Sequence, residues 1–216
     1  MIIKYLSMAI AFIIAIVGHE IMHGLVAKYY SDLTATYEGR LSINPIKHID
    51  PFGSIVFPLI LFASQKLAGV ENPLIFGWAK PVPINVFTVV KNGGYIGVFN
   101  VSIAGVTYNL FLAIIASSLI GFFINPDSVI DVIMFMFLAY LIIINVVLAV
   151  FNMFPIPPLD GANAIKFLAL HFRIYKIAQF YNKIEPYGTI ILLIILLTPF
   201  SNYLFYPAKV LISMLF

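Results

Sequence analysis

The segment His19-Glu20-Ile21-Met22-His23 places two histidines four residues apart, with a glutamate directly after the first. On a helix, side chains at positions i and i+4 lie on one face about one turn apart, so both imidazoles can reach a single Zn²⁺. The glutamate can then take a proton from a water molecule at the metal. The motif therefore predicts a hydrolytic zinc site with His19 and His23 as ligands and Glu20 as general base.

The alternative is a polar patch that hydrogen-bonds neighbouring helices, because a pattern with three fixed residues also occurs by chance. A glutamate inside a membrane helix costs roughly 2.5–3.5 kcal/mol on insertion scales, and ionisable groups there are functional by default. Three such groups within five residues of an apolar segment favour the metal site.

A tetrahedral catalytic zinc needs a third protein ligand and an open position. The chain has no cysteine, which leaves His48, His171 or a carboxylate. We expect His48 to organise its loop and His171 to be structural. Asp160 is better placed, because it follows the proline-rich residues 152–159, and backbone freed by prolines is tolerated at membrane depth only where it lines a cavity or is buried in protein. Alternatively, or simultaneously, Asp160 is the N-cap of the next helix.

The composition places these residues in a membrane protein. Of 216 residues, 62% are hydrophobic and 10% are charged, and the mean hydropathy is +1.04, whereas soluble domains are about half apolar and a quarter charged. We predict an all-α polytopic membrane protein with about four to six transmembrane helices in one integral-membrane domain, 1–216. Water-soluble enzymes, disordered chains and nucleic-acid-binding proteins are excluded. The net charge of +3 concerns lipid headgroups and topology instead.

Long apolar segments predict the spanning helices: residues 2–29, 95–124 and 132–151, and a last span from about Pro186. Residues 54–68 form a shorter apolar segment that contains a proline. We expect this segment to be re-entrant, since a full span would require another crossing before residue 95.

Three further segments carry weaker signals. Alternating apolar and polar residues over 33–37 and 40–43, around Glu38-Gly39, predict a short membrane-associated β-hairpin. Two prolines predict extended backbone over 76–87. Both segments could pair with an unwound substrate or, alternatively, form a rigid collar at the membrane surface. Residues 163–184 are expected to form an amphipathic helix on the lipid headgroups, with lysines and an arginine along one face.

The distribution of lysine and arginine predicts the orientation. The turn 124–131 has none, whereas 153–184 has four, so the former lies outside and the latter in the cytoplasm. The first span, which we read as retained rather than cleaved, then places His19 and His23 in its cytoplasmic half. The small size and the lack of a targeting segment suggest a prokaryotic cell membrane.

Four motifs together resemble the site-2 protease family of intramembrane zinc metalloproteases. They are HEIMH at 19–23, NPIKHIDPFGS at 44–54, FGWAKPVPIN at 76–85 and NMFPIPPLDG at 152–161. The resemblance implies that His19, His23 and Asp160 bind zinc and that Glu20 is the catalytic base. It also implies that Asn152 lies near the scissile peptide bond of a transmembrane protein substrate.

A further segment, Ala104 to Asn109, is similar to the family's Ala-Gly-Pro-x-x-Asn element, with Val106 in place of the proline. Asn109 could, like Asn152, hydrogen-bond the substrate backbone or an oxyanion. We expect a compact family member without the PDZ or CBS domain of some relatives. Substrate choice would then depend on the membrane core alone, on a homo-oligomer or on a regulatory membrane partner.

Two other functions compete with regulated intramembrane proteolysis. A non-catalytic membrane scaffold of the same fold would be marked by loss of Glu20 or a histidine, yet all three residues are present. A metal transporter or sensor would use His19, His23 and Asp160 as a transit site. Transporters usually have repeated halves with a broken helix in each, whereas this chain has one strong break and one histidine pair.

Overall fold

The computed structural model describes residues 2–67, 69, 77–198 and 200–216, whose regular structure is helical without a strand. The longer helices are α1 (Ile2–Tyr29), α3 (Phe57–Leu67), α4 (Val86–Ile120), α5 (Val129–Asn152), α6 (Asp160–His171), α7 (Tyr175–Ile184), α8 (Gly188–Leu197) and α9 (Ser201–Leu215). Short helical turns are α2 (Thr34–Tyr37), η1 (Pro45–His48), η2 (Pro51–Val56), η3 (Gly121–Phe123) and η4 (Glu185–Tyr187).

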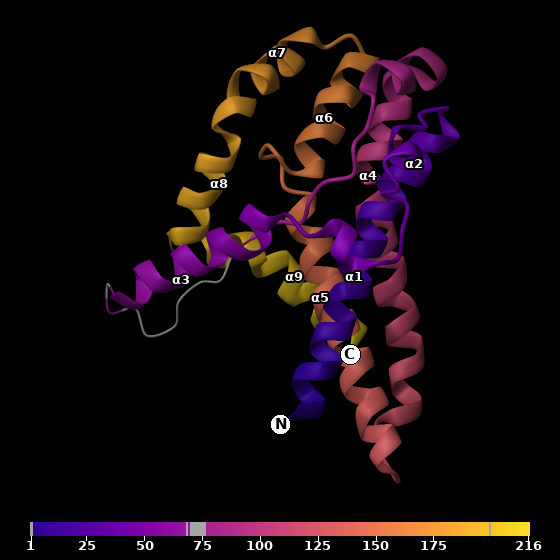
Figure 1. Cartoon of the computed structure of the whole chain (residues 1–216), viewed down its shortest axis with the longest axis vertical. Coiled ribbons are helices and arrows are strands. Elements are labelled where there is room, and N and C mark those ends of the chain that lie inside the picture. Colours follow the sequence, from indigo (N-terminus) through magenta and orange to yellow (C-terminus); the bar gives the residue numbers. More distant parts are fainter. Residues whose placement is uncertain (1, 68, 70–76, 199) are drawn as a thin grey trace.

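The helices α1, α4 and α5 pack against one another along their length and form the centre of the molecule (Figure 1). Small residues allow this close approach: Ala15 of α1 and Ala113 of α4 are fully buried. Ile142 and Val146 of α5 fill the space between them. Close packing of the three helices restricts the rotamers of the side chains that are buried between them.

Four helical segments are long and apolar enough to cross a membrane: Ile2–Tyr29, Val86–Phe123, Val129–Asn152 and Tyr175–Leu197. Their number, in the part of the chain that is described, lies at the low end of the predicted range. The second of these segments begins at Val86, nine residues before the predicted span at 95–124, and Gly94 interrupts it with a φ of +63°. Large apolar side chains on the surface of these helices, such as Phe12 and Phe111, fit a lipid environment.

The proline-rich turn after α5 brings α6 back against α4. The close packing requires glycine at position 161, because a Cβ atom there would lie 2.1 Å from the carbonyl oxygen of Met153. A Cβ atom at Gly188 would lie 2.2 Å from the carbonyl oxygen of Pro157. The start of α6 is therefore fixed between the end of α5 and the start of α8.

Residues 77–85 form neither helix nor strand, as the prolines predict, and lie along the loop that follows α2. Lys80 N–H donates to the carbonyl of His48, and Trp78 N–H donates to the carbonyl of Gly53. Asn85 N–H donates to the buried carboxylate of Asp32, just beyond the end of α1. Phe76, the first residue of the predicted extended segment, lies outside the described residues.

The predicted β-hairpin over 33–43 is wrong. Asp32 accepts hydrogen bonds from both the N–H and the hydroxyl of Thr34, which starts the helical turn α2. The following N–H groups then bond back within the turn, as Glu38 N–H does to the carbonyl of Thr34. These local bonds use the donors that a strand pairing would have needed.

The structure does not support a re-entrant segment at 54–68. From Pro51 to Leu67 the chain is continuously helical, through η2 and α3, and it does not turn back. Figure 1 shows α3 extending sideways from the long helices. Ala68, the last residue of the predicted segment, lies outside the described residues.

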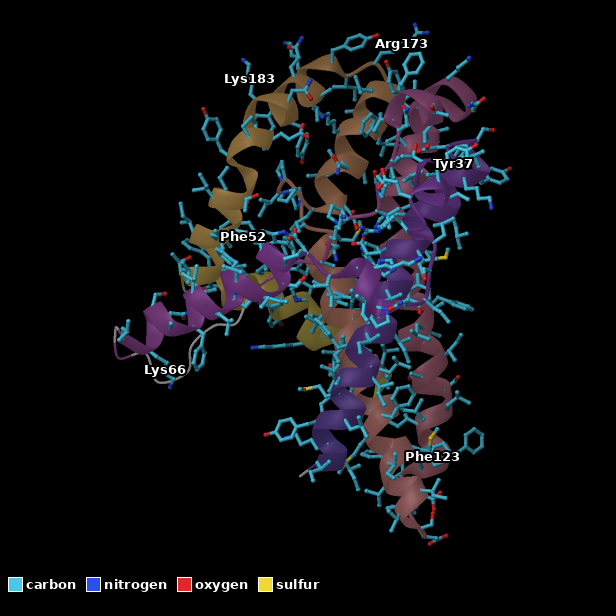
Figure 2. All side chains as sticks on the ribbon, viewed as in Figure 1. Tyr37, Phe52, Lys66, Phe123, Arg173 and Lys183 are labelled. Carbon is cyan, nitrogen blue, oxygen red and sulfur yellow. The ribbon has the colours of Figure 1, made fainter. Side chains whose placement is uncertain are left out.

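The single amphipathic helix predicted over 163–184 is also wrong. A break at residues 172–174, with Arg173 at a φ of +60°, separates α6 from α7. The basic residues therefore do not share one helix face, and Lys166 of α6 pairs with Glu185 at 2.9 Å. Figure 2 shows Arg173 and Lys183 at the end of the molecule opposite Phe123, as the predicted charge asymmetry requires.

Candidate metal centre

Two histidine rings meet on the inner face of α1. His19 and His23 are one turn apart and almost fully buried, with 6% and 7% of their surface exposed. Their Nε2 atoms lie 3.1 Å from each other. The helical spacing read from the sequence thus brings both rings to one point.

Asp160, the first residue of α6, supplies a third group from 137 positions beyond His23 in the sequence. Its Oδ2 atom lies 3.1 Å from His19 Nε2 and 3.3 Å from His23 Nε2. This oxygen is buried and accepts no hydrogen bond of acceptable geometry. Leu159 rather than Asp160 occupies the N-cap position, and α6 has no side-chain cap. The structure therefore does not assign the Asp160 carboxylate to helix capping.

The second nitrogen of each ring determines which atom faces the centre. His23 Nδ1 lies 2.7 Å from the carbonyl oxygen of Val101, which can only accept, so Nδ1 carries the proton. His19 Nδ1 donates to Asn109 Oδ1, since Asn109 Nδ2 donates to the carbonyl of Ala15. In its neutral form, each ring then directs the lone pair of Nε2 toward Asp160.

The three converging atoms fit a zinc ion. Two imidazole lone pairs and a carboxylate oxygen, mutually 3.1–3.3 Å apart, are all acceptors. A proton on one ring serves two of them at most, whereas one cation serves all three. Ligand atoms about 2.0–2.1 Å from a tetrahedral zinc are about 3.3 Å apart, which matches the observed triangle and leaves the fourth position open.

Gly105 of α4 forms the wall behind His19. A Cβ atom at this position would lie 2.5 Å from His19 Cε1 and 2.6 Å from Cδ2. The absence of a side chain at Gly105 is therefore what allows the ring to pack flat against α4.

Glu20 is half-buried beside the histidines and is held by the backbone of another segment. Its Oε2 atom accepts a hydrogen bond of 2.9 Å from the N–H of Val82. Because Pro81 and Pro83 have no N–H, this is the one backbone donor of the Pro-Val-Pro sequence. The second carboxylate oxygen, Oε1, is not used by this bond.

The other predicted candidates lie outside the metal-binding group. His48 is buried and its Nε2 donates to the carbonyl of Ser42, which matches the expected role in its loop. His171 contacts Phe172 at the exposed end of α6. Asn152 is half-buried and donates to the carbonyl of Leu148 in its own helix. Asn109 is fully buried behind His19, and its side chain bonds to His19, to the carbonyl of Ala15 and to Asn145.

The sequence analysis missed Asn145. This residue of α5 is fully buried and accepts a hydrogen bond from Asn109. A lone amide between Ile144 and Val146 in a long apolar helix is a signal that could have identified it, because buried polar groups in membrane helices face partners. The carbonyl of Val101 and the N–H of Val82 are backbone groups, which no residue pattern identifies.

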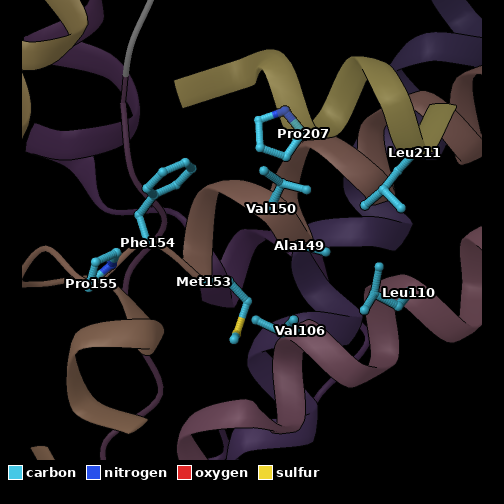
Figure 3. A pocket seen from close by; sticks show the side chains of 9 residues that line it. All are labelled: Val106, Leu110, Ala149, Val150, Met153, Phe154, Pro155, Pro207 and Leu211. Carbon is cyan, nitrogen blue, oxygen red and sulfur yellow. The ribbon is translucent and has the colours of Figure 1, made fainter. Parts of the chain in front are cut away.

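An apolar cavity of about 320 Å³ lies beside the centre, between α4, α5 and α9 (Figure 3). It is lined by Val106, Leu110, Ala149, Val150, Met153, Phe154, Pro155, Pro207 and Leu211. Val106 directly follows the glycine behind His19, and the carbonyl of Met153 contacts Gly161. Val106, which replaces the proline of the Ala-Gly-Pro-x-x-Asn element, thus lines this cavity.

Comparison with known proteins identifies the family. The chain is 36% identical over 204 residues to a Bacillus subtilis protein named "Putative zinc metalloprotease YwhC", an alignment that covers 93% of this chain and 84% of the relative. The chain belongs to the site-2 protease family. It is also 28% identical over 211 residues to "Putative zinc metalloprotease Rip2" of Mycolicibacterium smegmatis, covering 94% of this chain and 74% of the relative. No family model and no solved structure matches.

The names of these site-2 protease relatives support a metalloprotease function and zinc as its metal. The structure adds a group of side chains that could hold the ion, and helices long enough to cross a membrane. The alignments cover 93% and 94% of this chain.

Proposed function

We propose that this site-2 protease family member is an intramembrane zinc metalloprotease that cleaves peptide bonds in or near transmembrane segments of membrane proteins. The observation that carries the proposal is the buried triangle of His19 Nε2, His23 Nε2 and Asp160 Oδ2, three acceptors without a donor. A single bound cation would satisfy all three atoms at once, and this ligand set is that of a catalytic zinc with one open position.

The position of the triangle along α1 supports a site at membrane depth. His19 lies ten residues before the end of a 28-residue helix, which corresponds to about 15 Å along its axis. The basic residues of the α6–α7 region lie toward the same end of the molecule, which by the positive-inside rule is cytoplasmic. We therefore infer that the centre lies inside the bilayer, toward its cytoplasmic side.

In this proposal His19, His23 and Asp160 hold zinc, which supplies a Lewis acid to polarise the scissile carbonyl and to lower the pKa of water. Glu20 acts as general base through Oε1: it takes a proton from the attacking water and passes it to the leaving amine. The hydrogen bond from Val82 N–H to Oε2 holds the carboxylate in place for both transfers.

The asparagines have different proposed roles. Asn152, at the end of α5 and half-buried, binds the substrate backbone or the developing oxyanion. The loss of one such donor typically lowers the rate by 10²–10³-fold. Asn109 acts from behind His19 by orienting the ring.

The hydrogen bonds of residues 77–85 favour one of the two roles predicted for this segment. They favour a rigid collar at the membrane surface over a strand edge that pairs with the substrate. The N–H groups of Trp78, Lys80 and Val82 all donate within the protein. The buried side chain of Arg40 binds the carbonyl of Lys80 at 2.6 Å and that of Pro81 at 3.4 Å. Because these three N–H groups alternate along the extended segment, they lie on one edge, and on the opposite edge Pro81 and Pro83 have no N–H for an added strand.

The test combines metal content with cleavage by Glu20→Gln. Wild type and variant are purified in detergent, analysed for zinc, and incubated in vesicles with labelled single-span peptides, with and without a helix-breaking residue in the span. We expect about one zinc per chain in both proteins and cleavage by wild type only. Glu38→Gln, at an exposed carboxylate, is the control and should cleave normally. Full activity of Glu20→Gln, or zinc-free wild type, would refute the proposal.

A further inference from the structure

Behind His19, two asparagines form a buried polar pair between α4 and α5. Asn109 and Asn145 are both 0% exposed. Asn145 Nδ2 donates to the carbonyl of Leu141 at 2.7 Å, and Asn109 Nδ2 donates to Asn145 Oδ1 at 2.7 Å. Asn109 Oδ1 in turn accepts from His19 Nδ1. A chain of hydrogen bonds thus runs from the backbone of α5 to a ring of the metal centre.

The direction of every bond in this chain is fixed by a backbone carbonyl. Because the carbonyl of Leu141 only accepts, Asn145 must present its Nδ2 to it and its Oδ1 to Asn109. A reversed Asn109 amide would place its oxygen against Asn145 Oδ1 and against the carbonyl of Ala15, 3.2 Å away. The amide of Asn109 therefore has one orientation, and His19 Nδ1 must carry the proton.

We propose that Asn145 is a positioning residue of the metal centre. By locking the amide of Asn109, it keeps the proton of His19 on Nδ1 and the lone pair of Nε2 directed at the metal. Outer hydrogen bonds of this kind fix the tautomer and the orientation of metal-binding histidines. The inference rests on the proposed zinc site, and it extends that site to a residue of α5 outside every motif of the sequence analysis.

A purely structural role would make a different prediction. The neighbours Ile142 and Val146 are fully buried and apolar, so a role in packing alone would be served by an apolar side chain with the same branching, such as leucine, rather than by an amide. A buried aspartic acid would be a poor packing residue. In its neutral form, however, it can donate to the carbonyl of Leu141 and accept from Asn109, which is all that the positioning role requires.

The experiment compares Asn145→Leu, Asn145→Asp and the control Val146→Ala in the full chain in detergent. Zinc affinity is measured by competition with a chromophoric chelator, ligand geometry by the absorption spectrum of the Co²⁺-loaded protein, and stability by thermal unfolding. We expect Asn145→Leu to lose 10–100-fold in zinc affinity, typical of such outer partners, and to change the Co²⁺ spectrum. Asn145→Asp should lose much less zinc affinity than Asn145→Leu, because it keeps both hydrogen bonds. Val146→Ala should be less stable with unchanged affinity.

Wild-type affinity in Asn145→Leu would overturn the inference, as would an equal loss in Val146→Ala. If Asn145→Leu does not fold, Asn145→Ser replaces it. A serine hydroxyl can bond to the carbonyl of Leu141 but is too short to reach Asn109, so the same loss is expected and wild-type affinity again overturns the inference. Zinc-free wild type would refute the metal centre itself, whereas zinc-loaded wild type with unaffected Asn145 variants would refute only the role of Asn145.

Discussion

Replacement of Gly105 by alanine tests whether the position of the His19 ring controls metal binding. The added Cβ atom would lie 2.5 Å from His19 Cε1, whereas ordinary contacts begin at 3.4 Å, so the ring must retreat by about 0.9 Å. A zinc site tolerates deviations of about 0.2 Å in ligand distance. The ring also cannot retreat without disturbing its bond to Asn109. We expect zinc affinity to fall at least about 100-fold, or about 2.7 kcal/mol of binding free energy.

The assay is chelator competition in detergent, with Gly121→Ala as the matched control. Gly121 follows the same helix with an ordinary helical φ of −56°, and a Cβ atom there would meet nothing within 4 Å. Its replacement should leave zinc binding unchanged and stabilise the protein slightly, by about 0.4–1 kcal/mol. If Gly105→Ala bound zinc within twofold of wild type, the ring would not be confined as the structure indicates, and the reasoning would be refuted.

Three further predictions concern the metal and the loops. Asp160→Ala should lose most of its zinc on dialysis against a weak chelator that leaves wild type loaded; retained zinc would assign the third ligand elsewhere. Gly161→Ala should lower both zinc content and thermal stability, because its Cβ would meet a backbone oxygen at 2.1 Å that no side-chain rotation relieves; a stable, zinc-loaded variant would contradict this. The N–H of Gly53, followed by that of Phe52 and the indole of Trp78, keeps the pKa of Asp50 below its ordinary value of 3.8. The stability that the ionised Asp50 carboxylate contributes to the folded protein is therefore fully present above pH 3.8. This contribution is lost as the pH falls through the lower pKa of Asp50 in the folded state. Acid titration should shift the fluorescence of Trp78, the only tryptophan, and Asp50→Asn should abolish this transition.

Local sequence determined the helix that carries the histidine pair. The positions of His19 and His23 follow from four residues of helical rise, which does not depend on the rest of the chain. The apolar segments likewise predicted α1, α4 and α5, because a helix that satisfies its own backbone is the general solution in lipid. The kink at Gly94, in contrast, was not predicted.

The alternation of apolar and polar residues gave wrong predictions where a side chain bonds to a distant backbone group, or where a residue ends a helix. The alternation over 33–43 predicted strands, but the Asp32 carboxylate starts a helical turn and binds Asn85 N–H at the same time. The basic face over 163–184 assumed one continuous helix, and the left-handed conformation of Arg173 divides it. Neither event is encoded in hydrophobic periodicity.

The sequence by itself determined a histidine pair with a neighbouring glutamate on a long apolar helix, because their spacing along one helix fixes their geometry. Only the tertiary structure decided what completes the centre. The packing of α6 against α4 brings the Asp160 carboxylate to both rings, and the packing of α5 brings Asn145 behind Asn109. These contacts join residues 36 to 141 positions apart. Their distances depend on how close the helices approach, which small residues such as Gly105 and Gly161 allow but no local spacing specifies.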